Sequence, residues 1–158
     1  MNDLKRLISD ERFYDIILKC SDGRNVFGCK AILATRSKMF DELIFTGSAN
    51  KNLSFDNIDS NAMKVILEYL YTDMIEEKNL TVNNVIEVYY ASIHFNLVEL
   101  QKYIMCRTEM FLRDENEDAG KKLLSECVDK FSSMVDNDMS QVLVKWVAKD
   151  KLKKDEVD

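Results

Sequence analysis

Apolar residues alternate in short stretches near the start of the chain and recur every three or four positions further along it. Residues 15–20, DIILKC, are apolar and β-branched, and the turn residues SDG separate them from residues 24–29, RNVFGC. This arrangement predicts an antiparallel β-hairpin. Residues 52–55, NLSF, alternate over a shorter span and predict a third strand that joins the same sheet.

Helical spacing dominates the remaining sequence. Leu4, Leu7 and Ile8 predict a short opening helix with a charged opposite face. Residues 30–46 predict two short helices that break near Ser37, whose hydroxyl can cap the second one. Three strands with a cluster of helices predict an α+β fold. Further helices are predicted over residues 59–71, 81–95, 97–111, 124–135 and 137–147, with Asp59 or Ser60, Thr81 and Asn137 as capping candidates.

The charge cluster RDENED, residues 113–118, interrupts the apolar pattern and suggests a domain boundary. We therefore expect a first domain over residues 1–113 and a helical extension over residues 114–158. The chain length of 158 residues fits one compact domain with a small appendage that cannot bury a core alone. Because two helices can only partly cover the apolar face around Trp146, we expect the chain to be the N-terminal part of a longer protein.

Composition excludes several classes of partner. The formal net charge is -6 and the basic residues are scattered, so we expect no direct contact with nucleic acid. No apolar stretch is long enough to cross a bilayer and the N-terminus does not resemble a signal peptide, so a soluble protein without a membrane partner is expected. The four cysteines lack paired spacing, which predicts free thiols in the cytoplasm or the nucleus: Cys20, Cys29, Cys106 and Cys127.

The adjacent Cys29 and Lys30 are the first candidates for chemistry, since a nearby ammonium group can activate a thiol. A nucleophilic cysteine also needs a base, and the only histidine is His94, near a predicted helix end. Neighbouring residues at a strand end point to opposite faces, so we interpret Cys29 as a packing residue. One histidine and dispersed cysteines do not form a metal site. We expect no enzyme, catalytic residue, metal or cofactor.

Lys30 is harder to explain than Cys29, because a lysine within an apolar stretch is costly to bury unless it is paired. Asp15, at the start of the first predicted strand, is the natural partner if the strands bring the two residues together. For a buried pair, Asp15→Asn would weaken folding or dimerisation by about 3 to 5 kcal/mol. An exposed pair would give less than about 1 kcal/mol.

Residues 13–47 resemble a BTB/POZ domain, and the stretches 65–73, VILEYLYTD, and 89–104, YYASIHFNLVELQKYI, resemble the later helices of that family. The resemblance covers roughly residues 1–113, and the C-terminal helices are similar to the start of a BACK-type extension. Where the family usually has a histidine, this chain has Cys29. The family motif falls on Phe13, Asp15, Cys29, Lys30, Ile32, Leu33, Ala34, Ser37 and Phe40.

The resemblance implies a protein interaction module that forms a homodimer, with Asp15 and Lys30 near the two-fold axis. The opening helix would pack across that interface, and the alternative is that it packs on its own chain. The implied dimer interface comprises Leu4, Leu7, Ile8, Phe13, Asp15, Cys29, Lys30, Ile32 and Leu33.

Many members of the family recruit a cullin scaffold as adaptors of ubiquitin ligases, and the resemblance implies the same here. The family motif for this contact is a large apolar residue followed two positions later by Glu, and Ala49 and Lys51 stand at those positions. The implied cullin-binding surface comprises Phe40, Leu43, Phe45, Ala49 and Lys51. The alternative is an oligomerisation or transcription-regulatory module that binds other proteins without a cullin.

Overall fold

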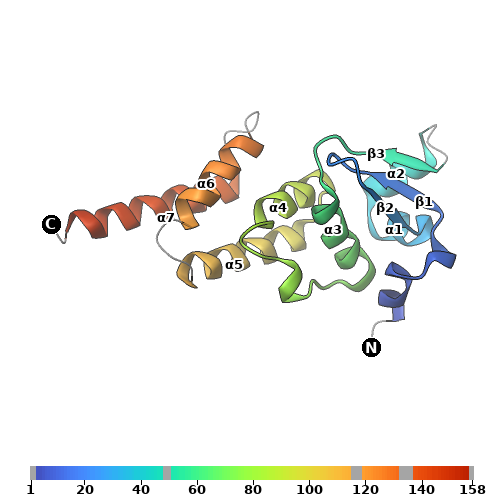
Figure 1. Cartoon of the computed structure of the whole chain (residues 1–158), viewed down its shortest axis with the longest axis horizontal. Helices are drawn as coiled ribbons and strands as arrows, with labels where there is room; N and C mark the ends of the chain where they lie inside the picture. Colours follow the sequence, from blue (N-terminus) through green and yellow to red (C-terminus); the bar gives the residue numbers. More distant parts are fainter. Residues whose placement is uncertain (1–2, 48–50, 115–118, 132–136, 157–158) are drawn as a thin grey trace. The chain divides into compact units, whose positions relative to one another are not determined.

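The computed structural model of the chain describes residues 3–47, 51–114, 119–131 and 137–156. It divides into two compact units, Met1–Gln101 and Lys102–Asp158, which are described separately (Figure 1). The first unit combines a small sheet with helices, and the second is helical. The α+β class expected from the sequence is confirmed.

The sheet of the first unit has the strand order β2-β1-β3. β1 (Ile16–Lys19) pairs antiparallel with β2 (Asn25–Gly28) and parallel with β3 (Asn52–Ser54). In the turn of the hairpin, Gly23 has a φ of 78°, a conformation that favours glycine. Both the hairpin and the third strand predicted from the sequence are therefore confirmed.

The register separates the two faces of the sheet. Ile16 and Leu18 of β1 are buried, together with Val26 of β2 and Leu53 of β3. Because successive side chains of a strand point to opposite faces, the intervening Ile17 lies on the outer face. Ile17 is opposite Phe27 of β2 and beside Asn52 of β3, and Phe27 is 43% exposed. One face of the sheet thus lies in the core, and the opposite face carries an apolar patch.

Short helices surround the inner face of the sheet (Figure 1). Their predicted caps are observed: the Ser37 hydroxyl accepts from the Phe40 N–H at 3.3 Å, and the Asp59 carboxylate accepts from the Ala62 N–H at 2.7 Å. The elements of the first unit are η1 (Asp3–Ile8), η2 (Glu11–Phe13), α1 (Lys30–Arg36), α2 (Lys38–Phe45), α3 (Ser60–Thr72), η3 (Glu77–Asn79) and α4 (Val85–His94).

Two predicted helix starts are wrong. The helix predicted over residues 124–135 begins earlier, at Ala119. α4 begins at Val85 and not at Thr81, because residues 81–84 close a separate turn. The Asn84 Oδ1 accepts from the Thr81 N–H at 2.8 Å, and the Thr81 hydroxyl accepts from the Asn83 N–H at 3.3 Å. Local side-chain bonds of this kind compete with a helix for the same backbone groups.

Aromatic rings join the core of the first unit. Phe40 of α2 stacks on Phe95 with ring centroids 4.6 Å apart, and Phe55 meets both rings edge to face. Stacked and edge-to-face rings add about 0.5 to 1.5 kcal/mol beyond the area that they bury. These three residues connect α2, the end of β3 and the end of α4, so they position the outer surface of α2.

The second unit contains the helices α6 (Ala119–Lys130) and α7 (Asp138–Asp155), while α5 (Val98–Asp114) begins in the first unit and ends in the second. Asn137 accepts from the Ser140 N–H at 2.9 Å and caps α7 as predicted. A Cβ atom added to Gly120 would lie 3.1 Å from Trp146, so these two helices approach closely there. The residues buried along α6 and α7 include Leu123, Cys127, Met139 and Leu143.

Candidate interaction surfaces

The first candidate surface is the corner between β2 and α1, formed by Asp15, Gly28, Cys29 and Lys30. The Asp15 carboxylate accepts from the Lys30 backbone N–H at 2.7 Å, and the Asp15 N–H donates to the Gly28 carbonyl at 3.0 Å. Lys30 is the first residue of α1, so the carboxylate satisfies a backbone donor at the helix N-terminus and complements the helix dipole. The fold therefore brings Asp15 and Lys30 together, with the bond to Asp15 made by the lysine main chain.

The exposure of the corner changes the expected cost of altering it. In the single chain, Asp15 is exposed and Lys30 is half-buried. The value of about 3 to 5 kcal/mol applies to a buried pair, and the exposed carboxylate does not meet that condition. We correct the expectation for folding to that of a helix cap, about 1 kcal/mol.

Tyr71 of α3 supports the corner from inside, which the sequence analysis did not anticipate. Its hydroxyl accepts from the Cys29 N–H at 2.8 Å, and burial raises the pKa of Tyr71 to about 12, so the phenol stays protonated at neutral pH. A Cβ atom on Gly28 would lie 3.0 Å from the Leu33 side chain, so the corner has little room for a larger residue. A tyrosine inside an apolar helical stripe was the available signal, since a buried phenol needs a partner.

Arg36 ties α1 to α3, and this role was also missed. Its Nε donates to the Leu70 carbonyl at 2.9 Å, and its guanidinium pairs with Asp73. Asp73 is the C-cap of α3 and has a φ of 60°, the left-handed conformation common at helix ends. The corner is thus held against α3 at Tyr71 and at Arg36.

His94, the base considered for Cys29, packs on aromatic rings. The structure places His94 against the rings of Phe55 and Phe95, with centroids 5.9 and 5.0 Å away. Within the described residues no group of three or more His, Cys, Asp and Glu side chains could hold a metal ion. All four cysteines are free.

The opening segment η1 packs on α3 of its own chain. Lys5 pairs with Glu76, and the Tyr14 hydroxyl donates to the Ile8 carbonyl at 2.6 Å. Leu7 and Ile8 are half-buried, whereas Leu4 is 40% exposed. Packing on its own chain, the alternative to packing across a dimer, is what the single chain shows, and Leu4 remains accessible to a partner.

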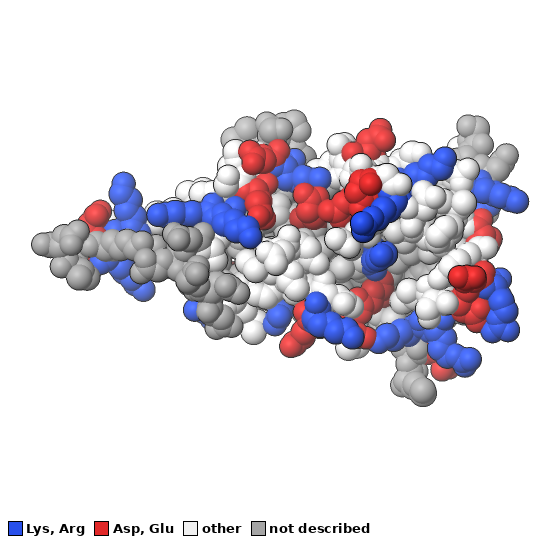
Figure 2. All heavy atoms as spheres, in the orientation of Figure 1, with Lys and Arg blue, Asp and Glu red and all other residues white. Residues whose placement is uncertain are grey.

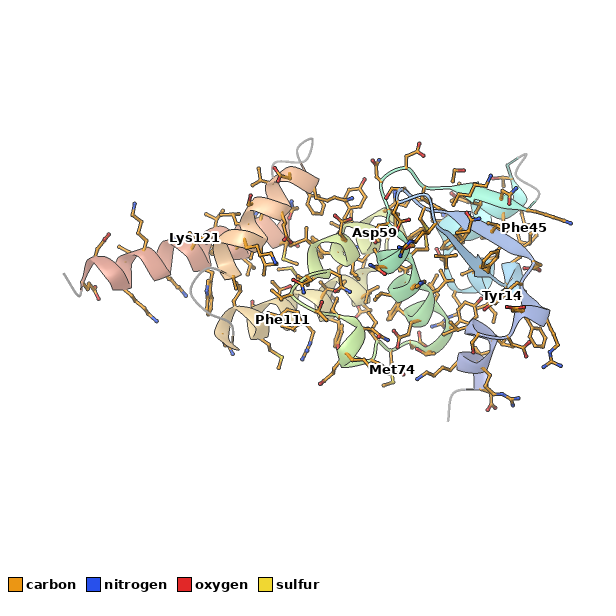
Figure 3. The ribbon with its side chains drawn as sticks, in the orientation of Figure 1. Tyr14, Phe45, Asp59, Met74, Phe111 and Lys121 are labelled. Atoms are coloured by element: carbon orange, nitrogen blue, oxygen red, sulfur yellow. The ribbon has the colours of Figure 1, made fainter. Side chains whose placement is uncertain are left out.

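The second candidate surface, called the α2 surface, comprises the hollow residues Met39, Leu43, Phe55 and His94 together with Phe45 at the end of α2. Phe45 is 67% exposed, and Figure 3 shows it at the outer end of the first unit near β3. The other four residues line a hollow of about 310 Å³. Burial lowers the pKa of His94, so the imidazole is neutral at neutral pH.

The structure divides the residues predicted to bind a cullin. Leu43 and Phe45 lie on the α2 surface, but Phe40 is 0% exposed in the core. Lys51 lies on the sheet, where its carbonyl accepts from the Ile17 N–H at 2.8 Å. Ala49 lies outside the described residues. We therefore correct Phe40 from a surface residue to a core residue.

The residues predicted for the dimer interface divide in the same way. Phe13 is 45% exposed, and Ile32 and Cys29 are half-buried. Leu33 is 0% exposed because it packs beneath the corner, so its side chain has no surface to offer a partner. Leu33 is corrected to a core residue, and the others remain predicted interface residues.

Among the helices that the structure describes, none is long and apolar enough to span a membrane. On the face shown in Figure 2, acidic and basic side chains of the first unit are intermixed, without a continuous basic stripe. This distribution offers no track for a phosphate backbone on that face.

Comparisons with known proteins agree on one family. The family model described as BTB/POZ domain matches residues 4–114. Kelch-like protein 41a of Danio rerio is 35% identical over 100 residues, which cover 60% of this chain and 16% of the relative. The chain therefore spans less than one fifth of the length of this relative.

Solved structures show the same fold. The BTB domain of human gigaxonin matches with a TM-score of 0.54 and 23% identity, over 65% of this chain and 82% of that one. The BTB domain of zebrafish PATZ1 matches with a TM-score of 0.54 and 23% identity, over 67% of this chain and 87% of that one. Together with the family model, these matches establish that the chain belongs to the BTB/POZ domain family.

Proposed function

We propose that this BTB domain forms a homodimer through the corner and recruits a cullin scaffold through the α2 surface, as an adaptor of a ubiquitin ligase. The family consists of non-enzymatic protein interaction modules, and the dimer and the cullin are the specific parts of the proposal. The observation that carries the cullin part is the 67% exposed Phe45 at the end of α2, the helix whose Leu43 lines a hollow. Four free cysteines support a cytoplasmic or nuclear location.

The dimer is supported by accessible apolar side chains in the N-terminal segment that leads to Asp15 of the corner. Phe13 and Leu4 are 45% and 40% exposed, and both precede Asp15 in the N-terminal segment. In an isologous contact the same patch meets itself, so these residues would bury one another. Association would also cover the Asp15 carboxylate and strengthen its interactions.

Light scattering coupled to size exclusion tests the dimer. The chain has a mass of 18.4 kDa, and we expect twice this mass at tens of micromolar. Phe13→Asp should shift the mass toward that of a monomer, because it places a charge in the apolar contact. A strict monomer at this concentration contradicts the proposed dimer.

Binding to a purified cullin N-terminal domain tests the proposed recruitment of a cullin through the α2 surface. Phe45→Asp should abolish binding at micromolar concentration, because exposed aromatic residues are typical anchors of interfaces. Phe27→Asp is a matched control: Phe27 is also an exposed aromatic residue, but it lies on the outer face of the sheet. Equal loss in both variants would contradict a specific role of the α2 surface.

Lys51 favours a second function, a module that oligomerises and binds other proteins without a cullin. The family motif has Glu at this position, so Lys51 reverses the charge that a cullin would meet. If the chain does not bind the cullin domain but Lys51→Glu does, the reversed charge is the cause. If neither binds at micromolar concentration, the second function is favoured.

A further inference from the structure

The outer face of the sheet carries a hollow that neither proposed interface explains. It has a volume of about 570 Å³, and Glu11, Tyr14, Asp15, Ile16, Ile17, Phe27 and Lys51 line it. Its floor is apolar because Ile17 and Phe27 are opposite each other in the register of β1 and β2. We call this hollow, with the residues that line it, the sheet hollow.

An aromatic wall forms one side of the sheet hollow. The rings of Tyr14 and Phe27 are stacked, with centroids 5.6 Å apart and planes inclined by 12°. Figure 3 shows Tyr14 near the start of β1. The Tyr14 hydroxyl is fixed by its bond to the Ile8 carbonyl, so the ring is held in place before any ligand arrives. Faces of aromatic rings attract cations through their quadrupole.

Carboxylates complete the hollow. Glu11 and Asp15 both line it, and the pKa of Tyr14 is raised by burial and, to a smaller extent, by the negative charges of Glu11 and Asp10. The Arg12 guanidinium lies 2.7 Å from the Asp10 carboxylate and neutralises it. Of these two acidic residues, only Glu11 lines the hollow. Among the residues that line the hollow, Lys51 carries the opposing charge.

We propose that the sheet hollow binds a cationic side chain, arginine or lysine, presented by an extended segment of a partner protein. The aromatic wall and the two carboxylates complement a positive charge, while Ile17 contacts the aliphatic part of such a side chain. Lys51 weakens the site electrostatically and thereby limits its affinity. Asp15 is shared with the corner and Lys51 with the residues expected to meet a cullin, but Glu11, Tyr14 and Phe27 lie outside both proposed interfaces, so the site does not depend on the proposed function.

The first test uses two synthetic peptides with the full 158-residue chain. One is acetyl-Ser-Gly-Arg-Gly-Ser-amide, and the other has citrulline, which keeps the shape of arginine without its charge. Titration followed by NMR should shift the backbone signals of Ile17 and Phe27 with the arginine peptide, and the citrulline peptide should bind about threefold or more weakly. Equal binding of both peptides, or no shift with either, would overturn the proposal.

Two charge variants test whether the affinity for the arginine peptide changes in the direction that the proposed electrostatics predict. Glu11→Gln should weaken binding of the arginine peptide about twofold to fivefold, and Lys51→Gln should strengthen it by a similar factor. Glu42→Gln, an exposed change on α2, is the matched control and should leave the affinity unchanged. Each variant is checked for an unchanged circular dichroism spectrum and mass, so that altered folding or dimerisation is recognised. A Lys51→Gln variant that binds more weakly would contradict the proposed role of charge.

Discussion

The corner and the α2 surface belong to the same compact unit but are held by different interactions. At the corner, directional hydrogen bonds fix the main chain: Asp15 binds the Lys30 N–H at 2.7 Å, and Tyr71 binds the Cys29 N–H at 2.8 Å. Under the α2 surface, stacked rings of Phe40 and Phe95 provide the support. The conformation of the corner therefore depends on individual hydrogen bonds. The position of the α2 surface depends on the volume of the buried rings beneath it.

This difference determines how each surface responds to substitution. A hydrogen bond contributes about 0.5 to 1.5 kcal/mol net, and loss of one partner leaves the other unsatisfied. Removal of a buried ring leaves a cavity and costs several times more. Substitutions at Phe40, Tyr71, Asp15 and His94 should separate these two responses.

Phe40→Ala should lower the free energy of unfolding by about 3 to 5 kcal/mol, because it removes a fully buried ring. Urea denaturation followed by circular dichroism measures this change. Phe45→Ala on the same helix is the control, and it should change the free energy by less than about 0.5 kcal/mol because Phe45 is 67% exposed. Similar costs for both variants would show that the buried Phe40 ring does not support α2.

Tyr71→Phe should lower the free energy of unfolding by about 1 to 2 kcal/mol, because the half-buried Cys29 N–H loses its acceptor while the ring volume is kept. The same denaturation experiment applies. Tyr69→Phe on the same helix is a matched control at a half-buried position and should have a smaller effect. A cost above that of Phe40→Ala would reverse the comparison between the two surfaces.

Asp15→Ala should cost about 1 kcal/mol in the monomeric chain, the usual value for a lost helix cap. Asp15→Asn should cost less, since an amide oxygen can still accept from the Lys30 N–H. Thermal unfolding at low protein concentration measures both, with the exposed Asp56→Ala as a control. If Asp15→Asn lowered the free energy of unfolding by about 3 kcal/mol or more, the result would support a buried charge pair between Asp15 and Lys30 instead.

His94 should give the smallest effect, a dependence of stability on pH. Burial lowers its pKa from the ordinary value of 6.5, so the unfolded chain binds a proton more readily than the folded one. The contribution of His94 to stability is complete above pH 6.5 and is lost as the pH falls toward the lowered value. His94→Asn should flatten the unfolding free energy over this interval, measured from pH 7 down to pH 5. An unchanged profile would show that the ring is solvated.

The elements of the first unit were largely predictable from local patterns. The hairpin followed from DIILKC, the turn SDG and RNVFGC, and the caps at Ser37, Asp59 and Asn137 followed from their position before apolar periodicity. The start of α4 was not predictable in this way, because the side chains of Thr81 and Asn84 close a turn of their own. Local competition for hydrogen bonds determined that boundary.

Exposure was the property that local patterns predicted least well. Leu33 and Phe40 belong to the family motif and were expected at interfaces, yet both are 0% exposed. A motif records which residues a fold needs and does not separate those that build a surface from those that support it. Conversely, the stack of Tyr14 on Phe27 joins residues of an irregular segment and a strand, and no periodicity relates them.

The order of strands and helices was determined by the sequence itself, because it follows from hydrophobic period and turn residues, and the family was indicated by the resemblance of residues 13–47 to the BTB/POZ motif. Only the tertiary structure decided that Tyr71 and Arg36 hold the corner, that Lys51 and Leu43 line different hollows, and that Tyr14 and Phe27 line the same hollow as Glu11. Those contacts join residues distant in the chain. Their geometry is fixed by how the helices pack on the sheet, which no local pattern contains.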